Sequence, residues 1–479
     1  MPDELARLDA VAQAALVASG AVQPHELVEA AIARAERLDP ALNAIIHPAY
    51  ERARTRARGP LPPGPLCGVP MLMKDIGGAE AGEPYCAGMQ FLRDAGFRAP
   101  EDSHFTTKVK AGGLVSLGRT NTPELALLPT TEPSAFGATA NPWNPQHSAG
   151  GSSGGAAAAV AAGIVPVAHA SDGGGSIRGP ASMTALVGLK PTRARCSFGP
   201  ALGERWNGFS CEFFVTRSVR DAALLLDVVA GPMPGDPYHA PAPAAPFATA
   251  PGRPPGRLRI GVLPTAPRNV ETTADAVAAA QRLARRLEAL GHDVEEAHPE
   301  VLEDPVVVQT YVTIVATNIA RALESWGAQV GREVTADAVE PLTWALAEIG
   351  RGMTAAQLLA AIESAHLLGR RLAAWWESGF DLLLTPTQGA APPELGWITS
   401  TPEEPLRAFL RAAPYGVFTL PFNISGQPAV SLPGFWTEAG LPVGAQLVAA
   451  FGREDLLLSV AAQLEAAHPW HERRPALHA

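Results

Sequence analysis

Two glycine-rich segments carry residue types that acyl-transfer chemistry requires. Residues 148–155 read S-A-G-G-S-S-G-G, and residues 171–180 read S-D-G-G-G-S-I-R-G-P. Successive glycines let backbone N–H groups converge on one point because no Cβ blocks the approach, and such a nest stabilises an anion. Ser176 ends the second nest. One segment can therefore supply a nucleophile together with oxyanion donors, which are the N–H groups of Gly173, Gly174, Gly175 and Ser176.

A single lysine stands upstream in an apolar run. Lys74 lies between Val69 and Ile76, and only Pro70 and Asp75 otherwise interrupt that run. Most lysines are solvated, but this setting predicts burial, and burial lowers the pKa of an ammonium group. A neutral lysine can accept a proton from a hydroxyl. The hypothesis is a relay in which Lys74 is the base, Ser152 the bridge and Ser176 the nucleophile.

These residues and their spacing resemble the amidase signature family. The match consists of K-D at 74–75, G-G-S-S-G-G at 150–155 and S-D-x-G-G-S-I-R at 171–178, and weaker similarity extends over nearly the whole chain. Ser152 follows Lys74 by 78 residues, and Ser176 follows Ser152 by 24. The resemblance implies that Ser152 has a cis peptide bond and shuttles the proton, and that Ser176 attacks the carbonyl. It also implies that neither a metal nor an organic cofactor is needed.

Apolar segments alternate with helical patterns along the chain, which favours an α/β fold with helices on both faces of a sheet. The resemblance implies an α/β/α sandwich around a mixed, mostly parallel, twisted sheet. We expect a single amidase domain over residues 1–479, with its signature core at about 68–200. The proline content of residues 231–256 predicts a surface connection without regular structure. Residues 306–378 are expected to be a variable helical region that covers the site.

Several residues near the two loops have supporting roles in this interpretation. Asp172 and Arg178 are expected to form a structural ion pair that holds the second loop. Ser153 either orients the relay through its hydroxyl or caps the following helix. Gly173 and Gly179 stand where the family commonly has a larger and an apolar residue, respectively, so the second loop is expected to be more open.

The substrate is predicted less directly. The segment around Ser176 looks most like members of the family that open cyclic 6-aminohexanoate diamides from nylon waste. Those members have a cysteine near position 318, where this chain has Asn318 within V-A-T-N-I-A. A pocket of uncharged residues from 306–378 and 414–425 is expected to favour uncharged linear or cyclic amides. The alternatives are an aryl or short-acyl amidase, the glutaminase subunit of a tRNA-dependent amidotransferase, and a catalytically silent ligand-binding relative.

Other interpretations of the first glycine-rich loop have less support in the sequence. Gly150 to Gly154 also satisfies G-x-S-x-G, the nucleophile elbow of α/β-hydrolases. An elbow follows a strand directly, whereas N-P-W-N-P-Q-H-S-A precedes this loop and is unsuited to a central strand. The phosphate-loop signature is absent. A flexible linker is disfavoured because an Ala-rich segment follows and predicts a loop-to-helix junction.

Composition limits the partners. The chain has 479 residues, 47% of them hydrophobic, and a net charge of −10, which argues against a nucleic-acid partner. The chain contains no run of 18 apolar residues, so a membrane span is not predicted. The N-terminus lacks a signal-peptide layout. The four cysteines have no metal-ligand spacing, so free thiols in a cytoplasmic protein are expected. The expected partners are a small-molecule amide and, as an option, a second copy of the chain in a homodimer.

Overall fold

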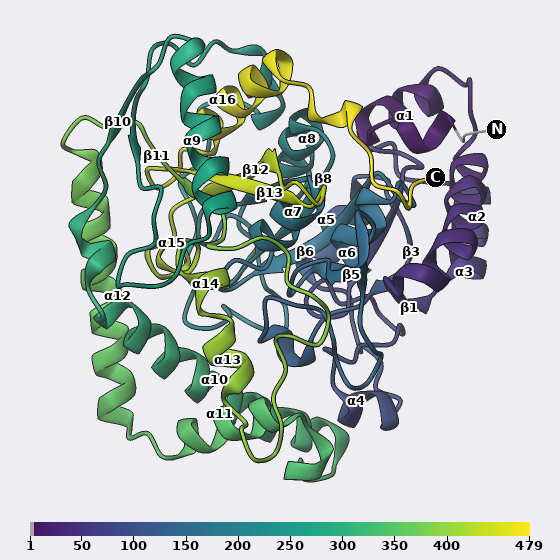
Figure 1. The fold of residues 1–479 in the computed structure, drawn as a ribbon. Coiled ribbons are helices and arrows are strands. Elements are labelled where there is room, and N and C mark those ends of the chain that lie inside the picture. Colours follow the sequence, from purple (N-terminus) through teal and green to yellow (C-terminus); the bar gives the residue numbers. More distant parts are fainter. Residues whose placement is uncertain (1–3) are drawn as a thin grey trace.

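The central element is one eleven-stranded sheet, seen in a computed structural model that describes residues 4–479 (Figure 1). Its strand order is β1-β3-β2-β6-β8-β7-β12-β13-β11-β9-β10, and β4 and β5 form a separate pair. The strands span Ile45–Pro48, Pro70–Lys74, Val115–Thr120, Ala140–Asn141, Asn144–Ser148, Val167–Asp172, Val187–Lys190, Cys211–Thr216, Arg259–Val262, Asp293–Glu296, Leu382–Pro386, Ala429–Trp436 and Pro442–Ala449 for β1 to β13.

The mixed character of the sheet is confirmed, but the expectation of mostly parallel pairing is wrong. Six of its ten strand pairs are antiparallel and four are parallel. Strand β8 runs antiparallel between β6 and β7, and a short turn joins the antiparallel hairpin of β12 and β13. Apolar strand patterns do not encode direction, because burial on both faces produces the same run in either orientation.

Helices cover both faces of the sheet, as expected. Helices α8 and α16 pack on each other and on β8 and β13, whereas α6 and α7 pack on each other and on β6 and β7, respectively. The α-helices span Ala10–Ala18, Pro24–Leu42, Tyr50–Arg58, Gln90–Asp94, His104–Ala111, Gly154–Ala161, Arg178–Thr184, Val219–Val229, Ala274–Ala289, Val306–Val330, Pro341–Arg351, Ala355–Trp376, Arg407–Arg411, Ala413–Gly416, Leu420–Ser425 and Glu454–Ala467 for α1 to α16.

The proline-rich segment 231–256 is mostly irregular, but it contains one 3₁₀ helix, Phe247–Gly252, where no regular structure was expected. The Asp227 carboxylate accepts the N–H groups of Phe247 and Ala248 at the start of this turn, at 2.8 Å each. The short helix packs on α8 and α16. A side-chain acceptor from a neighbouring helix thus satisfies donors that would otherwise be orphaned.

The predicted helical region 306–378 forms α10, α11 and α12, and α10 packs against both of the other helices at one end of the molecule (Figure 1). By length and composition alone, α10 is apolar enough to cross a membrane. Its buried residues instead contribute to two apolar clusters shared with α11 and α12. This packing is typical of a core helix in a globular protein.

Candidate active site

Lys74 lies at the carboxyl end of β2, a strand buried along its whole length. Strand β6 runs parallel beside β2, so its own carboxyl end lies at the same edge of the sheet. The Lys74 side chain is 0% exposed. Its Nζ lies 2.7 Å from Ser152 Oγ, 2.9 Å from Ser153 Oγ and 3.1 Å from Ser171 Oγ. The predicted burial of the lysine and its proximity to Ser152 are therefore present.

The surroundings of Lys74 favour its neutral form. Burial lowers the pKa of the Lys74 ammonium well below its usual value, and the Arg205 charge lowers it further, while Asp172 and Glu212 oppose the shift. A neutral amine has two N–H donors and one lone pair. Three hydroxyl oxygens around Nζ match these groups when two of them accept the N–H donors and the third hydroxyl donates to the lone pair. The arrangement can therefore move a proton between a serine and Lys74.

Ser152 and Ser153 sit where the first glycine-rich loop enters α6. The peptide bond between Gly151 and Ser152 is cis, as the family resemblance implied. Ser153 is the N-cap residue of α6 by position, but its hydroxyl makes no capping hydrogen bond. That hydroxyl accepts from Lys74 Nζ and donates to the Ser171 carbonyl at 3.3 Å. Of the two predicted roles for Ser153, the geometry fits orientation of the lysine.

Ser171 is a site residue that the sequence interpretation missed. It lies on β6 beside β2, and its hydroxyl is the third oxygen around Lys74 Nζ. A pattern signal existed, because Ser171 and Asp172 are polar residues at the end of a buried strand next to the strand of Lys74. Only the pairing of β2 with β6 turns that signal into a contact.

Ser176 lies on the turn between β6 and α7, and it differs from Ser152 in accessibility. Ser152 is buried, whereas Ser176 is partly exposed and lines a cavity together with Gly174 and Gly175. A nucleophile must reach its substrate, and a proton relay is better kept from water. The burial pattern therefore matches the predicted division of roles between these two serines.

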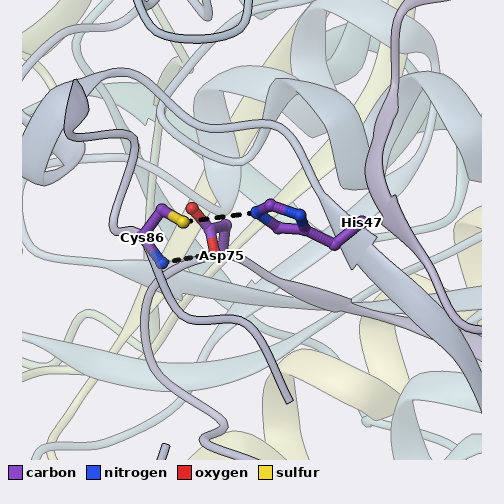
Figure 2. A group of neighbouring side chains, drawn as sticks. All are labelled: His47, Asp75 and Cys86. Atoms are coloured by element: carbon purple, nitrogen blue, oxygen red, sulfur yellow. Dashed lines mark hydrogen bonds between the residues drawn. The ribbon is translucent and has the colours of Figure 1, made fainter. Parts of the chain in front are cut away.

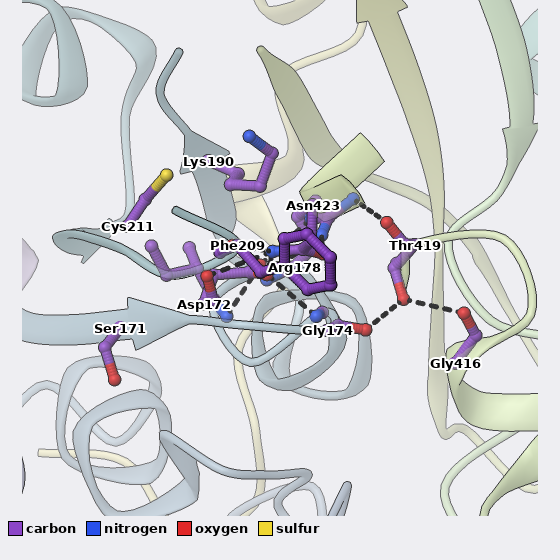
Figure 3. A network of polar contacts seen from close by, with 12 residues as sticks. Ser171, Asp172, Gly174, Arg178, Lys190, Phe209, Cys211, Gly416, Thr419 and Asn423 are labelled. Atoms are coloured by element: carbon purple, nitrogen blue, oxygen red, sulfur yellow. Dashed lines mark hydrogen bonds and ion pairs between the residues drawn. The ribbon is translucent and has the colours of Figure 1, made fainter. Parts of the chain in front are cut away.

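The Asp172 carboxylate holds the turn that carries Ser176 (Figure 3). Its Oδ1 accepts the Gly175 N–H at 2.7 Å, and its Oδ2 accepts the Ile177 N–H at 3.1 Å. Gly175 has φ +131°, and a Cβ there would lie 2.5 Å from Thr419 Oγ1, so this position requires glycine. The Thr419 hydroxyl in turn donates to the Gly174 carbonyl at 2.6 Å.

Asp172 and Arg178 form the expected structural ion pair, fully buried and 2.9 Å apart (Figure 3). Burial by itself would raise the pKa of the Asp172 carboxyl, but the Arg178 guanidinium holds that pKa well below its usual range. Arg178 also donates to Asn423 Oδ1, Gln446 Oε1 and the Thr419 carbonyl. These bonds tie the Ser176 turn to α15 and β13.

The second loop leaves some of its predicted oxyanion donors free. The Gly175 N–H is already bonded to Asp172, whereas the N–H groups of Gly173, Gly174 and Ser176 have no protein acceptor within residues 4–479. A Cβ on Gly173 would lie 2.7 Å from the Trp206 ring, and one on Gly174 would lie 2.4 Å from the Tyr311 hydroxyl. Aromatic side chains therefore fill the space that Gly173 was expected to leave open.

The cavity beside Ser176 has a volume of about 230 Å³ and a mostly apolar lining. The predicted regions supply only part of that lining, through Val308, Tyr311 and the stretch from Tyr415 to Leu420. Residues 126–129, 409–410 and 412–413 contribute as well, and Arg268 is a charged exception to the expected uncharged wall. A larger hollow of about 520 Å³ lies between the N-terminal helices and the C-terminal tail, and Ser152 and Ser176 do not line it.

Asn318 does not line the cavity and acts on it only through a neighbour. From α10, its Nδ2 donates to Asn207 Oδ1 at 3.0 Å and to the Ile314 carbonyl at 2.9 Å. Asn207 directly follows Trp206, whose ring forms part of the cavity wall. Substrate contact by Asn318 stays a prediction.

One cluster in the described residues has metal-ligand chemistry. The potential ligand atoms of His47, Asp75 and Cys86 all lie within 4.8 Å of one another (Figure 2). Both Asp75 oxygens already accept backbone N–H groups, and Arg119 Nε lies 3.5 Å from one of them. Burial raises the pKa of the Cys86 thiol to about 12, which disfavours the thiolate that binds metals. The cluster therefore fits a hydrogen-bonded core better than a cation site.

Comparison with known proteins gives concordant results. Residues 26–458 match the Amidase family model. A 6-aminohexanoate-cyclic-dimer hydrolase of Pseudomonas sp. (strain NK87) is 44% identical over 477 residues, covering 98% of this chain and 96% of the relative. A solved structure of 6-aminohexanoate cyclic dimer hydrolase superposes with a TM-score of 0.96 and 44% identity, covering 98% of this chain and 99% of the other. A bacterial aryl acylamidase superposes with a TM-score of 0.86 and 28% identity, covering 97% and 98%.

Proposed function

The chain belongs to the amidase family and is an amidohydrolase, and we propose that it cleaves uncharged amides through Lys74, Ser152 and Ser176. One observation carries the mechanism. A buried lysine whose pKa is lowered contacts three serine hydroxyls, that of Ser152 among them, and Ser176 is partly exposed and lines a cavity. Neither a metal nor an organic cofactor has a role in the proposal.

In the first half-reaction, Lys74 Nζ accepts the hydroxyl proton of Ser152 as Ser152 Oγ accepts that of Ser176. Ser176 Oγ then bonds to the carbonyl carbon of the amide, and the carbonyl oxygen becomes an oxyanion. We assign the N–H groups of the 173–176 loop as its donors, and those of Gly173, Gly174 and Ser176 are available because they are unbonded. The C–N bond breaks, and the relay returns its proton to the leaving amine.

In the second half-reaction, water attacks the acyl ester on Ser176. The relay takes a proton from that water, and the carboxylic acid leaves as the ester C–O bond breaks and Ser176 regains its hydrogen. Burial of Lys74 supports this scheme, since an unprotonated amine near neutral pH can serve as a base in both half-reactions. Serine and lysine thus take the roles that histidine has in other serine hydrolases.

The proposed substrates are linear or cyclic amides with methylene chains, such as 6-aminohexanoate oligomers or their cyclic dimer. Two observations support this class: the apolar cavity lining, and the 44% identity to a hydrolase named for the cyclic dimer. A screen of linear and cyclic amides with detection of the released amine tests the proposal. Cleavage of the cyclic dimer or of a linear oligomer would support it.

Two other substrate classes stay open as alternatives. An aryl or short-acyl amidase is supported by the structural similarity to the aryl acylamidase. The glutaminase subunit of a tRNA-dependent amidotransferase would require a polar pocket for glutamine, which the apolar lining disfavours.

We also propose a cytoplasmic location, which the four free cysteines support.

A further inference from the structure

Gln388, two residues after β11, has a buried acceptor atom without a partner. The residue is 1% exposed, and its Oε1 makes no hydrogen bond with the described residues. Its Nε2 donates to the Tyr415 carbonyl at 3.4 Å. If the nitrogen and oxygen of the Gln388 amide were exchanged, the side-chain oxygen would face the Tyr415 carbonyl oxygen, and both atoms are acceptors. The atom without a partner is therefore the oxygen. A buried acceptor in this state is costly and calls for a donor from outside the protein.

Gln388 lines the same cavity as Ser176. A Cβ on Gly179 would lie 2.7 Å from Gln388 Nε2 and 3.6 Å from the Gly151 carbonyl oxygen. Gly151 precedes Ser152, and Gly179 follows Ser176 by three residues. Gly179, which stands where the family commonly has an apolar residue, thus leaves room for the Gln388 amide between the two serine loops.

We propose that Gln388 Oε1 accepts a hydrogen bond from the N–H of the amide that is being cleaved. The inference rests on the proposed attack by Ser176, which commits the amide carbonyl oxygen to the loop donors. The N–H is then the remaining polar group of the scissile bond. Primary and secondary amides have this hydrogen, whereas esters and N-alkylated amides lack it. Gln388 therefore selects amides that carry an N–H.

The test compares hexananilide with phenyl hexanoate, two substrates of matched shape that differ in the N–H. In Q388M, which keeps the length of the side chain and removes the acceptor, kcat/KM for the anilide should fall about 10-fold, the size of one lost hydrogen bond. The ester value should change less than about twofold, because the ester offers no N–H to lose. Q427M is the matched control, since Gln427 is also buried but does not line the cavity. It should leave the anilide-to-ester ratio unchanged.

A second variant guards against misfolding of Q388M. G179A places a methyl carbon only 2.7 Å from Gln388 Nε2, closer than the two atoms can pack, so it should displace the amide and lower the anilide-to-ester ratio while Gln388 is retained. Equal losses on both substrates in Q388M and G179A, or no loss on either, would overturn the inference. Wild-type protein that cleaves neither these two substrates nor the 6-aminohexanoate oligomers and cyclic dimer would overturn the proposed function as well, whereas normal turnover with an unshifted ratio would overturn the role of Gln388 alone.

Discussion

Lys74 Nζ and Ser152 Oγ are 2.7 Å apart, and both residues are completely buried. A charged ammonium in that position would lose its hydration and gain only neutral hydroxyl partners in return. The neutral amine avoids this cost and gains a proton donor at hydrogen-bond distance. The packing of two strands and a glycine-rich loop therefore creates the contact that lets Lys74 act as a base.

The pH dependence of activity should follow the protonation of Lys74. Burial, with Arg205, lowers the pKa of the Lys74 ammonium, so the free base is populated at a lower pH than for a solvated lysine. Activity requires that base, so kcat/KM should rise with pH and level off well below the usual lysine pKa of about 10.5. A pH–rate profile that continues to rise up to that value would contradict the assignment.

Removal of the base should nearly abolish turnover. Lys74→Ala should lower kcat by about 10²–10⁴-fold, the range for loss of a general acid–base group. Circular dichroism and thermal melting would verify that the variant is folded. The substrate should be an amide with a poor leaving group, since activated substrates need less proton transfer. Near-normal turnover of such an amide by the folded variant would rule out the relay.

Ser171 should position Lys74 without taking part in the proton transfer. Ser171→Ala removes one of three oxygens around Nζ and should lower kcat by about 3- to 10-fold, the effect of one neutral hydrogen bond. KM should stay close to its normal value because Ser171 does not line the cavity. Steady-state kinetics on one amide would measure both. A rise in KM with unchanged kcat would show that Ser171 does not act through the lysine.

The Asp172–Arg178 pair should be required for folding as well as for the Ser176 turn. Asp172→Asn leaves a buried guanidinium with no counter-charge and should lower the free energy of unfolding by about 3–5 kcal/mol, measured by urea denaturation. Asp293→Asn at the exposed Arg257 pair is the control and should have no measurable effect. Because the folded-state pKa of Asp172 is depressed, its stabilisation is present above the unfolded pKa of about 3.9. It is lost only as pH falls further toward the folded pKa.

Glutamine should be a poor substrate. The cavity wall is mostly apolar, and its Arg268 already donates to the backbone carbonyls of Leu302 and Val417. Asp172 and Arg178 are committed to each other, so little remains to bind the zwitterionic end of an amino acid. Ammonia release from free glutamine should be far slower than amine release from neutral amides of similar size. A rate on glutamine that matches or exceeds the neutral amides would put the glutaminase alternative first.

The sequence identified the candidate catalytic residues more readily than the residues that surround them. Lys74, Ser152 and Ser176 could be found because each stands in a local pattern, an apolar run or a glycine nest, that is unusual for its residue type. Ser171 and Gln388 have no such pattern, since a serine ending a strand or a glutamine after T-P-T is common. The role of Ser171 arises from the pairing of β6 with β2, and that of Gln388 from the packing of its segment near Gly179, about 200 residues away in the chain. Local periodicity encodes neither of these contacts.

For the fold, too, the local elements were easier to predict than the way they assemble. Strands and helices follow from burial patterns, and the α/β arrangement with two helical layers is confirmed. Strand direction was wrong in part because a doubly buried strand such as β8 reads alike in either orientation. The cavity wall was predicted from two regions but draws on others, since Trp206 and residues 126–129 reach it through long loops.

The most direct test of the proposed mechanism is to identify the residue that becomes acylated. Ser176 is partly exposed in the cavity, whereas Ser152 is buried behind it and bonded to Lys74. A fluorophosphonate followed by peptide mass spectrometry should modify wild-type protein at Ser176 and leave a folded Ser176→Ala variant unlabelled and inactive. Stoichiometric labelling of Ser152, or full turnover by Ser176→Ala, would contradict the account.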